Sequence, residues 1–340
     1  MLKERNNITM GNKYSIVIPC YKSSATIQKV VEMTAQELEK LGIHDYEFVL
    51  VNDSSPDEGK TIAVLRKLNA LYPYVTVVDL AKNAGQHNAI MAGLHYVSGS
   101  FVIGMDDDMQ THPSQIKFLI EEIQKGYDVV YGFYPQKKHS VFRNLGSKFN
   151  YWTSRLLLGK PKNMQTSSFW IMRRFVADSM LSYTNSYAYL QGLVLRTTKN
   201  ISCIPIQHFE REVGTSTYTF KALVRLWSSI LGFSIVPLRL ASYMGYIFSL
   251  LGILGSIIVI ARKILSPEMA IGWPSVMCAI LFFAGINLLF IGLVGEYVGR
   301  IFLSLNKEPQ YVVRQIYQAR GGKDEENNDL GCGDLSSTSH

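Results

Sequence analysis

The sequence is poor in the features that mark disulfide scaffolds, zinc sites and the common nucleotide-binding loops. Its four cysteines, Cys20, Cys203, Cys278 and Cys332, are scattered and form no Cys-x-x-Cys pair. We therefore expect free thiols in a reducing compartment. The chain has no Walker lysine loop and no G-x-G-x-x-G run, which argues against a P-loop NTPase and against a dinucleotide-dependent oxidoreductase.

Charge is also scarce. Charged residues make up 18% of the 340 residues and hydrophobic residues 47%, and this charged fraction is low for a wholly soluble protein. The net charge of +7 favours phosphate-bearing partners or an anionic membrane surface. No stretch carries the Lys/Arg stripe of a DNA-recognition helix, so we expect no nucleic-acid partner. Residues 1–13 lack an apolar signal core and are expected to be a flexible lead-in that begins in the cytoplasm.

Three adjacent carboxylates follow an apolar run. Phe101 to Ile103 read as a short buried strand, and Asp106, Asp107 and Asp108 come directly after it. Like charges repel, and a divalent cation offsets that cost. On an extended chain Asp106 and Asp108 face the same side and Asp107 faces away. We therefore expect Asp106 and Asp108 to bind Mg²⁺ or Mn²⁺, which would hold substrate phosphates; the alternative is a solvated acidic turn.

The first 130 residues alternate between strand and helix patterns. The expected strands are 15–19, 47–51, 75–80 and 101–103, and the expected helices are 25–41, 58–71 and 88–97. This alternation is typical of an α/β domain with a parallel sheet.

Polar clusters follow three of these strands. They are Asp53, the run from Asn83 to His87, and the run from Asp106 to Gln110. Parallel strands place such ends on one edge of the sheet, where open α/β folds bind ligands. Each cluster alone also fits an ordinary turn, so the prediction of a site rests on the three together.

Four motifs in order resemble the family 2 glycosyltransferases, which have a GT-A (Rossmann-like) fold. They are SIVIPCY from Ser15, VNDSSPD from Val51, NAGQHNAIMAG from Asn83 and DDDMQTHP from Asp106. Within that family the chain is similar to the polyprenyl-phosphate glycosyltransferases. It most resembles the undecaprenyl-phosphate 4-deoxy-4-formamido-L-arabinose transferases and, more distantly, the dolichyl-phosphate mannose synthases. The resemblance runs from about Tyr14 to Tyr317.

The resemblance implies roles for the residues of these motifs. A nucleotide-diphosphate sugar, expected to be UDP-linked, would be the donor, and transfer would invert the anomeric carbon. Asp53 would contact the base. Asp106, Asp108 and Gln110 would surround the metal and the diphosphate, with Asp108 catalytic. The other implied substrate-binding residues in these motifs are Pro19, Tyr21, Asn83, Gly85 and Gln86.

A later segment is expected to bind the acceptor. HFEREVGTSTY from His208 resembles the family's Arg-x-x-Gly-x-Ser-Lys segment. The likeness implies that Arg211 is catalytic and that Ser216 binds substrate, while Thr217 stands where the family often has lysine. An arginine fork suits a phosphate. The alternative for Arg211 is a surface salt bridge to a neighbouring glutamate.

The sequence also departs from the family pattern between Thr166 and Trp170. This run has no carboxylate, and Trp170 replaces the usual arginine. A sugar hydroxyl acceptor would need a general base there. A phosphate monoester is largely a dianion near neutral pH, since its second pKa is about 6. It can attack without a base, which leaves positioning and charge stabilisation as the work of catalysis.

The C-terminal third is apolar. No charged residue occurs from about 240 to 261 or from about 274 to 295, and each run is about the length of ~20 residues that spans a bilayer core. We expect a transmembrane hairpin within residues 240–303; a buried soluble hairpin is the alternative. The flanking Lys and Arg residues predict that both termini and the catalytic domain are cytoplasmic.

The predicted organisation follows from these patterns. A GT-A domain at 14–219 precedes interfacial amphipathic helices at 220–239. The hairpin and a cytoplasmic tail at 304–340 come next, and the tail is expected to be disordered after about 319. The fold class is thus an α/β GT-A catalytic domain followed by interfacial helices and a two-helix transmembrane hairpin.

The sequence predicts an enzyme of cell-envelope polysaccharide or lipopolysaccharide modification. It would transfer a sugar to polyprenyl (undecaprenyl) phosphate at the cytoplasmic face of a bacterial inner membrane. Its partners would be the donor, the lipid acceptor and the bilayer, with a homo-oligomer left open. One alternative is a processive glycan synthase, although Gln191 and Arg196 do not make that group's Gln-x-x-Arg-Trp signature. The other is a catalytically inactive sugar-nucleotide scaffold.

Overall fold

The computed structural model describes residues 12–135, 161, 164–185, 188–207, 209, 236–265, 272–306 and 309–319. The strands are β1 (Tyr14–Cys20), β2 (Tyr46–Asn52), β3 (Val75–Leu80), β4 (Phe101–Gly104), β5 (Val129–Phe133), β6 (Trp170–Arg173), β7 (Ile201–Pro205) and β8 (Val313–Tyr317). The helices are α1 (Ile27–Lys40), α2 (Lys60–Leu71), α3 (Gln86–Leu94), α4 (Ile116–Ile123), α6 (Arg174–Leu181), α7 (Leu190–Thr197), α9 (Val236–Leu265) and α10 (Trp273–Leu305), and a 3-10 turn, η2, covers Pro113–Gln115.

The strands form one sheet in the order β7-β5-β6-β4-β1-β2-β3-β8. Strands β4, β1, β2 and β3 run parallel, as the strand–helix alternation predicts. Strand β6 is antiparallel to β4 and β5, and β8 is antiparallel to β3. The central part of the sheet is therefore parallel, and its carboxyl edge gathers the loops that follow β1 to β4.

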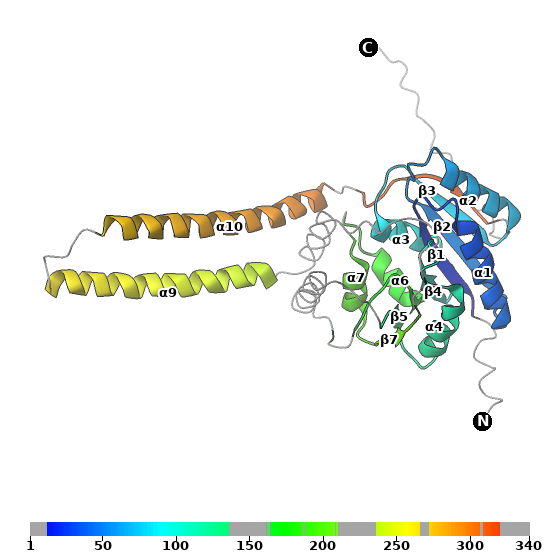
Figure 1. The fold of residues 1–340 in the computed structure, drawn as a ribbon, viewed down its shortest axis with the longest axis horizontal. Coiled ribbons are helices and arrows are strands. Elements are labelled where there is room, and N and C mark those ends of the chain that lie inside the picture. The colour runs from blue at the N-terminus through cyan, green and yellow to red at the C-terminus, as the bar shows by residue number, and fades with distance from the viewer. Residues whose placement is uncertain are drawn as a thin grey trace, which may run out of the picture.

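Helices cover both faces of this sheet (Figure 1). Along β1, Ile16 and Ile18 pack in the core cluster that contains α1, α2 and α4, while Val17 packs in the cluster that contains α3, α6 and α7. This alternation follows from the two-residue period of a strand. Because both faces are buried, the strands are apolar almost without a break, which is typical of a parallel sheet between helical layers.

The direction in which the chain adds strands to the sheet reverses between β1 and β4. Strand β1 pairs with β2 on one side and with β4 on the other. The chain therefore fills the sheet outward from β1 in both directions. Open α/β sheets bind their ligands at the carboxyl ends of strands at such a switch point.

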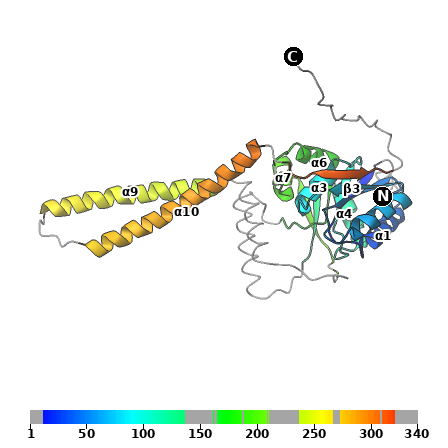
Figure 2. The same ribbon diagram turned by 90° about the horizontal axis from the view of Figure 1, so that it is seen from above.

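Strand β8 was not expected from the sequence. The segment Val313–Tyr317, which follows the two long helices, returns to the domain and pairs with β3 at the edge of the sheet. Figure 2 shows it alongside β3. The GT-A sheet thus includes residues beyond the expected domain end at 219.

Two long helices precede this strand. Helix α9 has 30 residues and α10 has 33, and they project together from one end of the sheet domain (Figures 1 and 2). Both exceed the predicted apolar runs, and α9 begins within the stretch expected to be interfacial. Among the described residues, one segment, Phe282–Gly299, has the length and hydropathy of a membrane span, with a mean hydropathy of 1.6 and none of it buried. The rest of the expected interfacial stretch, 220–235, lies outside the described residues.

Candidate active site

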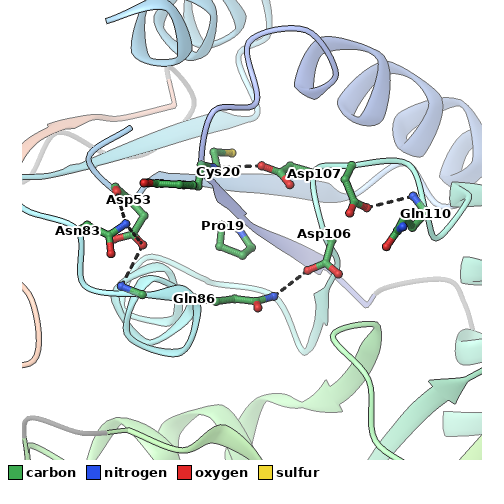
Figure 3. A pocket seen from close by; sticks show the side chains of 11 residues that line it. Pro19, Cys20, Asp53, Asn83, Gln86, Asp106, Asp107 and Gln110 are labelled. Carbon is green, nitrogen blue, oxygen red and sulfur yellow. Dashed lines mark hydrogen bonds between the residues drawn. The ribbon is translucent and has the colours of Figure 1, made fainter. Parts of the chain in front are cut away.

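A pocket of about 330 Å³ opens at the switch point of the sheet (Figure 3). It is lined by Pro19, Cys20, Tyr21, Asp53, Asn83, Gly85, Gln86, Asp106, Asp107, Asp108 and Gln110. These residues come from the end of β1, from the loops after β1, β2, β3 and β4, and from the first residue of α3. Apart from Arg211 and Ser216, which lie outside the described residues, each residue predicted for the site lines this pocket. The sequence did not point to Cys20 or assign Asp107 a role.

Backbone strain gathers in the same loops. Lys22, Ser54 and Met109 have φ angles of 59°, 48° and 60°, although residues with a side chain rarely adopt positive φ. They lie in the loops after β1, β2 and β4. Such conformations persist where the surrounding contacts hold them, and they cluster at functional sites.

The carboxylate of Asp53 holds the loop after β3. Its Oδ1 accepts a hydrogen bond from the amide of Ala84 at 2.6 Å, and its Oδ2 accepts from Gly85 N and Asn83 Nδ2, each at 3.0 Å. Asp53 is 4% exposed. Burial raises the pKa of this carboxyl, and the two backbone amides counteract that rise in part. Asp53 thus joins the ends of β2 and β3 into one wall of the pocket.

The three carboxylates after β4 have different partners. Asp106 accepts a hydrogen bond from Gln86 Nε2 at 2.8 Å and another from the hydroxyl of Ser168. Asp108 Oδ1 accepts from the amide of Gln110 at 3.0 Å. Figure 3 shows Asp106 turned toward Gln86 and Asp107 turned toward the chain at Cys20.

Asp107 ties β4 to the loop after β1. Its Oδ2 accepts hydrogen bonds from the amide of Tyr21, at 3.1 Å, and from the hydroxyl of Ser23. Burial raises the pKa of the Asp107 carboxyl despite these two donors. Burial, followed by the nearby Asp107 charge, also raises the pKa of the Cys20 thiol well above its usual value. The thiol is therefore protonated at neutral pH, and we assign it no chemistry.

The strand alternation predicted for this cluster does not extend through it. Strand β4 ends at Gly104, and the chain bends from Asp107 onward, with Met109 at positive φ. Asp107 therefore turns away from Asp106 because Tyr21 and Ser23 bind it, rather than because of a two-residue period.

Comparison with known proteins matches both parts of the chain. The model of "Glycosyl transferase family 2" matches residues 15–181, and the "GtrB C-terminal hairpin" matches residues 236–301. The uncharacterized glycosyltransferase YkcC of Bacillus subtilis (strain 168) is 32% identical over 309 residues, which cover 90% of this chain and 94% of that protein. The undecaprenyl-phosphate 4-deoxy-4-formamido-L-arabinose transferase of Klebsiella pneumoniae (strain 342) is 32% identical over 307 residues, 89% of this chain and 93% of that protein.

The chain belongs to glycosyl transferase family 2. Its resemblance to this family and its α/β GT-A fold with a C-terminal helical hairpin are thereby confirmed. Among solved structures, glucosyl-3-phosphoglycerate synthase from Mycobacterium tuberculosis in complex with Mn²⁺ and UDP-glucose is a distant likeness. It is 19% identical with a TM-score of 0.49 and covers 69% of this chain and 83% of that chain.

In this glycosyltransferase the run 166–170, which has no carboxylate, contacts a residue that lines the pocket. The Ser168 hydroxyl donates a hydrogen bond to Asp106 Oδ2, so a neutral donor occupies a position next to the first aspartate. Trp170 is buried against Gly104, where an added Cβ would lie 2.2 Å from the indole ring. Trp170 is thus a packing residue of β6 that requires glycine on β4. The sequence had shown that this run lacks an acid but not that its serine contacts Asp106.

The chain after β7 also returns to the pocket. The amide of Phe209 donates to the carbonyl of Gln110 at 3.1 Å, and the Phe209 ring lies 5.3 Å from the ring of His112. Gln110 lines the pocket. The described chain therefore reaches the pocket rim at Phe209, shortly before Arg211 in the sequence.

Proposed function

We propose that this glycosyltransferase moves a sugar from a nucleotide-diphosphate sugar, UDP-linked, onto the phosphate of a polyprenyl lipid, with inversion at the anomeric carbon. The observation that carries the proposal is the presence, in one chain, of a carboxylate-lined pocket at the sheet switch point and of two long apolar helices. The Klebsiella relative, named for transfer to undecaprenyl phosphate, supports the choice of acceptor.

Mg²⁺ or Mn²⁺ would bind Asp106 and Asp108. Both side chains line the pocket, and within the described ranges no set of three or more acidic, His or Cys side chains forms a protein cage for an ion. This donor set fits Mg²⁺, which takes one or two carboxylates and completes its shell with water and substrate phosphates. When bound, the ion would stabilise the charge that develops on the leaving diphosphate.

The side chains of the pocket would position the donor. Gln86 and Ser168 fix the Asp106 carboxylate from two sides, and Asp53 holds the wall at which the base would lie. Tyr21, which is 47% exposed, is available at the pocket mouth to cover the nucleotide. An acceptor phosphate supplies its own negative oxygen, so no general base is required.

The acceptor would meet the donor at the bilayer surface. We propose that α9 and α10 span the inner membrane, with both termini and the catalytic domain in the cytoplasm. Described apolar side chains of these helices face outward, with Tyr246 71%, Leu288 70% and Ile291 66% exposed, as lipid contact requires. Arg211 and Ser216 follow Phe209 in the sequence and would bind the phosphate head group.

The proposal is tested with the purified full-length chain in detergent, a panel of nucleotide sugars, and either undecaprenyl phosphate or undecaprenol. We expect transfer only to the phosphate, and only with Mg²⁺ or Mn²⁺. Asp108→Asn should reduce turnover by roughly 100-fold or more without changing the melting temperature, whereas the exposed Asp45→Asn is the matched control. Full activity in EDTA would remove the metal from the account, and equal transfer to undecaprenol would remove the phosphate acceptor.

A further inference from the structure

Arg314 lies on β8 and faces a buried carboxylate on the neighbouring strand. Its Nη1 is 3.5 Å from Asp79 Oδ2, and its Nη2 donates to the carbonyl of Ala81 at 3.1 Å. Asp79 is 4% exposed, whereas the Arg314 side chain is 59% exposed. A buried carboxylate is costly without a partner, and β8 brings this cation to the edge of the sheet.

Asp79 in turn orients Asn52, its cross-strand partner on β2. Asn52 Nδ2 donates to Asp79 Oδ1 at 2.7 Å. An ionised carboxylate only accepts hydrogen bonds, so the Asn52 amide must present its nitrogen to Asp79. Its oxygen is thereby turned the other way, toward Ser55.

The contacts continue from Asn52 into two pocket loops. Asn52 Oδ1 accepts from the Ser55 hydroxyl at 2.8 Å and from the Ser55 amide at 3.3 Å. The Ser55 hydroxyl oxygen accepts from the amide of Lys22 at 3.1 Å. Ser55 directly follows Ser54, and both Ser54 and Lys22 have positive φ. These contacts hold the strained loops that carry pocket residues after β1 and β2.

The position of Arg314 depends on the segment that leads from α10 to β8. Gln310 Nε2 donates to the carbonyl of Tyr183 at 2.6 Å, and the Tyr311 hydroxyl lies 2.9 Å from His95 Nδ1. The amide of Ala81 donates to the carbonyl of Val312 at 2.8 Å. The chain is thus fastened to the α6 and α3 face before it reaches the sheet.

We propose that Arg314 is a positioning residue for the nucleotide half of the pocket. By pairing with Asp79 it fixes the orientation of the Asn52 amide, and through Ser55 it fixes the loops after β1 and β2. The segment that follows the hairpin therefore supports the donor site without contacting the donor. The inference rests on the proposed use of this pocket for a nucleotide-diphosphate sugar.

The test measures UDP binding by calorimetry in Mn²⁺, together with donor kinetics, on the full-length chain in detergent. Arg314→Ala should weaken UDP binding and raise the donor KM by roughly tenfold, with kcat changed by less than about twofold. A wild-type chain that binds no UDP would overturn the proposed function. A wild-type chain that binds UDP no better than Arg314→Ala would overturn the positioning role alone.

A second variant separates positioning from loss of stability. Asp79→Asn keeps a carbonyl oxygen for Asn52 Nδ2 but removes the charge, so Arg314→Ala combined with Asp79→Asn should bind UDP within about twofold of Asp79→Asn alone. The matched control is Arg66→Ala, because the Arg66 guanidinium lies over the ring of Tyr317 on the same strand at 5.2 Å. Arg66→Ala should leave UDP binding unchanged. A further loss of UDP binding in the double variant well beyond twofold, or a loss in Arg66→Ala equal to that in Arg314→Ala, would mean that Arg314 only attaches β8.

Discussion

Gln86, at the start of α3, donates a hydrogen bond of 2.8 Å from Nε2 to Oδ1 of Asp106, in the loop after β4. The bond joins the loop after β3 to the acidic cluster across the switch point. Ser168 binds the other oxygen of the same carboxylate. Two neutral donors therefore orient the carboxylate that, in the proposed function, binds the cation.

Removing the Gln86 donor should loosen this carboxylate. Partners that orient a metal ligand are worth about 10- to 100-fold in metal affinity or activity, so we expect Gln86→Ala to raise the Mn²⁺ concentration for half-maximal activity roughly tenfold. Gln28→Ala removes a similar amide–carboxylate bond, from Gln28 Nε2 to Glu32 at 2.9 Å on α1, and should change nothing. Metal titration of the transfer rate checks this. An unchanged Mn²⁺ requirement in Gln86→Ala would contradict the role of Asp106.

Asp53→Asn should weaken both the pocket and the fold. The amide would keep one acceptor oxygen, but its NH₂ group would face N–H donors of the loop after β3 that now bind the carboxylate. A buried donor left unsatisfied costs about 1–3 kcal/mol. We expect a lower melting temperature and a higher donor KM. Asp45→Asn, at an exposed position, serves as control. A wild-type melting temperature in Asp53→Asn would contradict the claim that this carboxylate joins the ends of β2 and β3.

The strands and the pocket could be predicted because local pattern decides them. The run Val75–Leu80 is rich in Val and Leu, which are typical of a strand, and the structure places β3 at those residues. Asp53, Asn83 and Asp106 could be brought together without coordinates, since parallel strands end on one edge. These features require only the sequence of each element and one rule of topology.

The contacts that the sequence could not reveal join distant segments. Val313–Tyr317 has a short, mixed pattern and pairs with β3, which precedes it by most of the chain. Arg314 and Asp79 look like surface residues until β8 and β3 are paired. Ser168 contacts Asp106 because β6 inserts antiparallel beside β4, and no local period indicates that pairing.

His87 should make stability depend on pH. Burial lowers its pKa to about 4, Nδ1 has no hydrogen-bond partner among the described residues, and the ring packs edge-on against Tyr189 at 5.5 Å. The unfolded chain takes up this proton near pH ~6.5. The free energy of unfolding therefore has its full value above that pH. It falls as the pH drops toward about 4, and the contribution of His87 to this fall is about 3 kcal/mol.

His87→Phe keeps an aromatic ring and removes the titration. Its melting temperature in detergent should fall less than that of the wild type between pH 7 and pH 4.5. His44→Gln, which changes a histidine whose side chain is 73% exposed, should retain the wild-type slope. If the melting temperatures of the wild type and of His87→Phe fell equally with pH, the burial of His87 would not account for the loss of stability in acid.

The hairpin should hold the protein in the membrane. Helices α9 and α10 are each longer than the ~20 residues that cross a bilayer core, so the full-length chain should remain in the pellet after a carbonate wash. A chain cut before the hairpin also loses β8 and Arg314, so release of such a fragment would not report on the helices alone. Immunoblotting of the washed fractions decides the point, and elution of the intact chain would contradict the spanning hairpin.

The most direct test of the central claim follows the β-phosphate and the sugar of the donor. Purified full-length protein is given undecaprenyl phosphate and a panel of UDP-sugars carrying ³²P at the β-phosphate and ³H in the sugar. Attack by the lipid phosphate on the anomeric carbon breaks the bond between the sugar and the diphosphate. The account therefore predicts ³H in the lipid fraction and ³²P in released UDP. Both labels in the lipid with release of UMP, or no lipid-linked sugar from any donor of the panel, would contradict it.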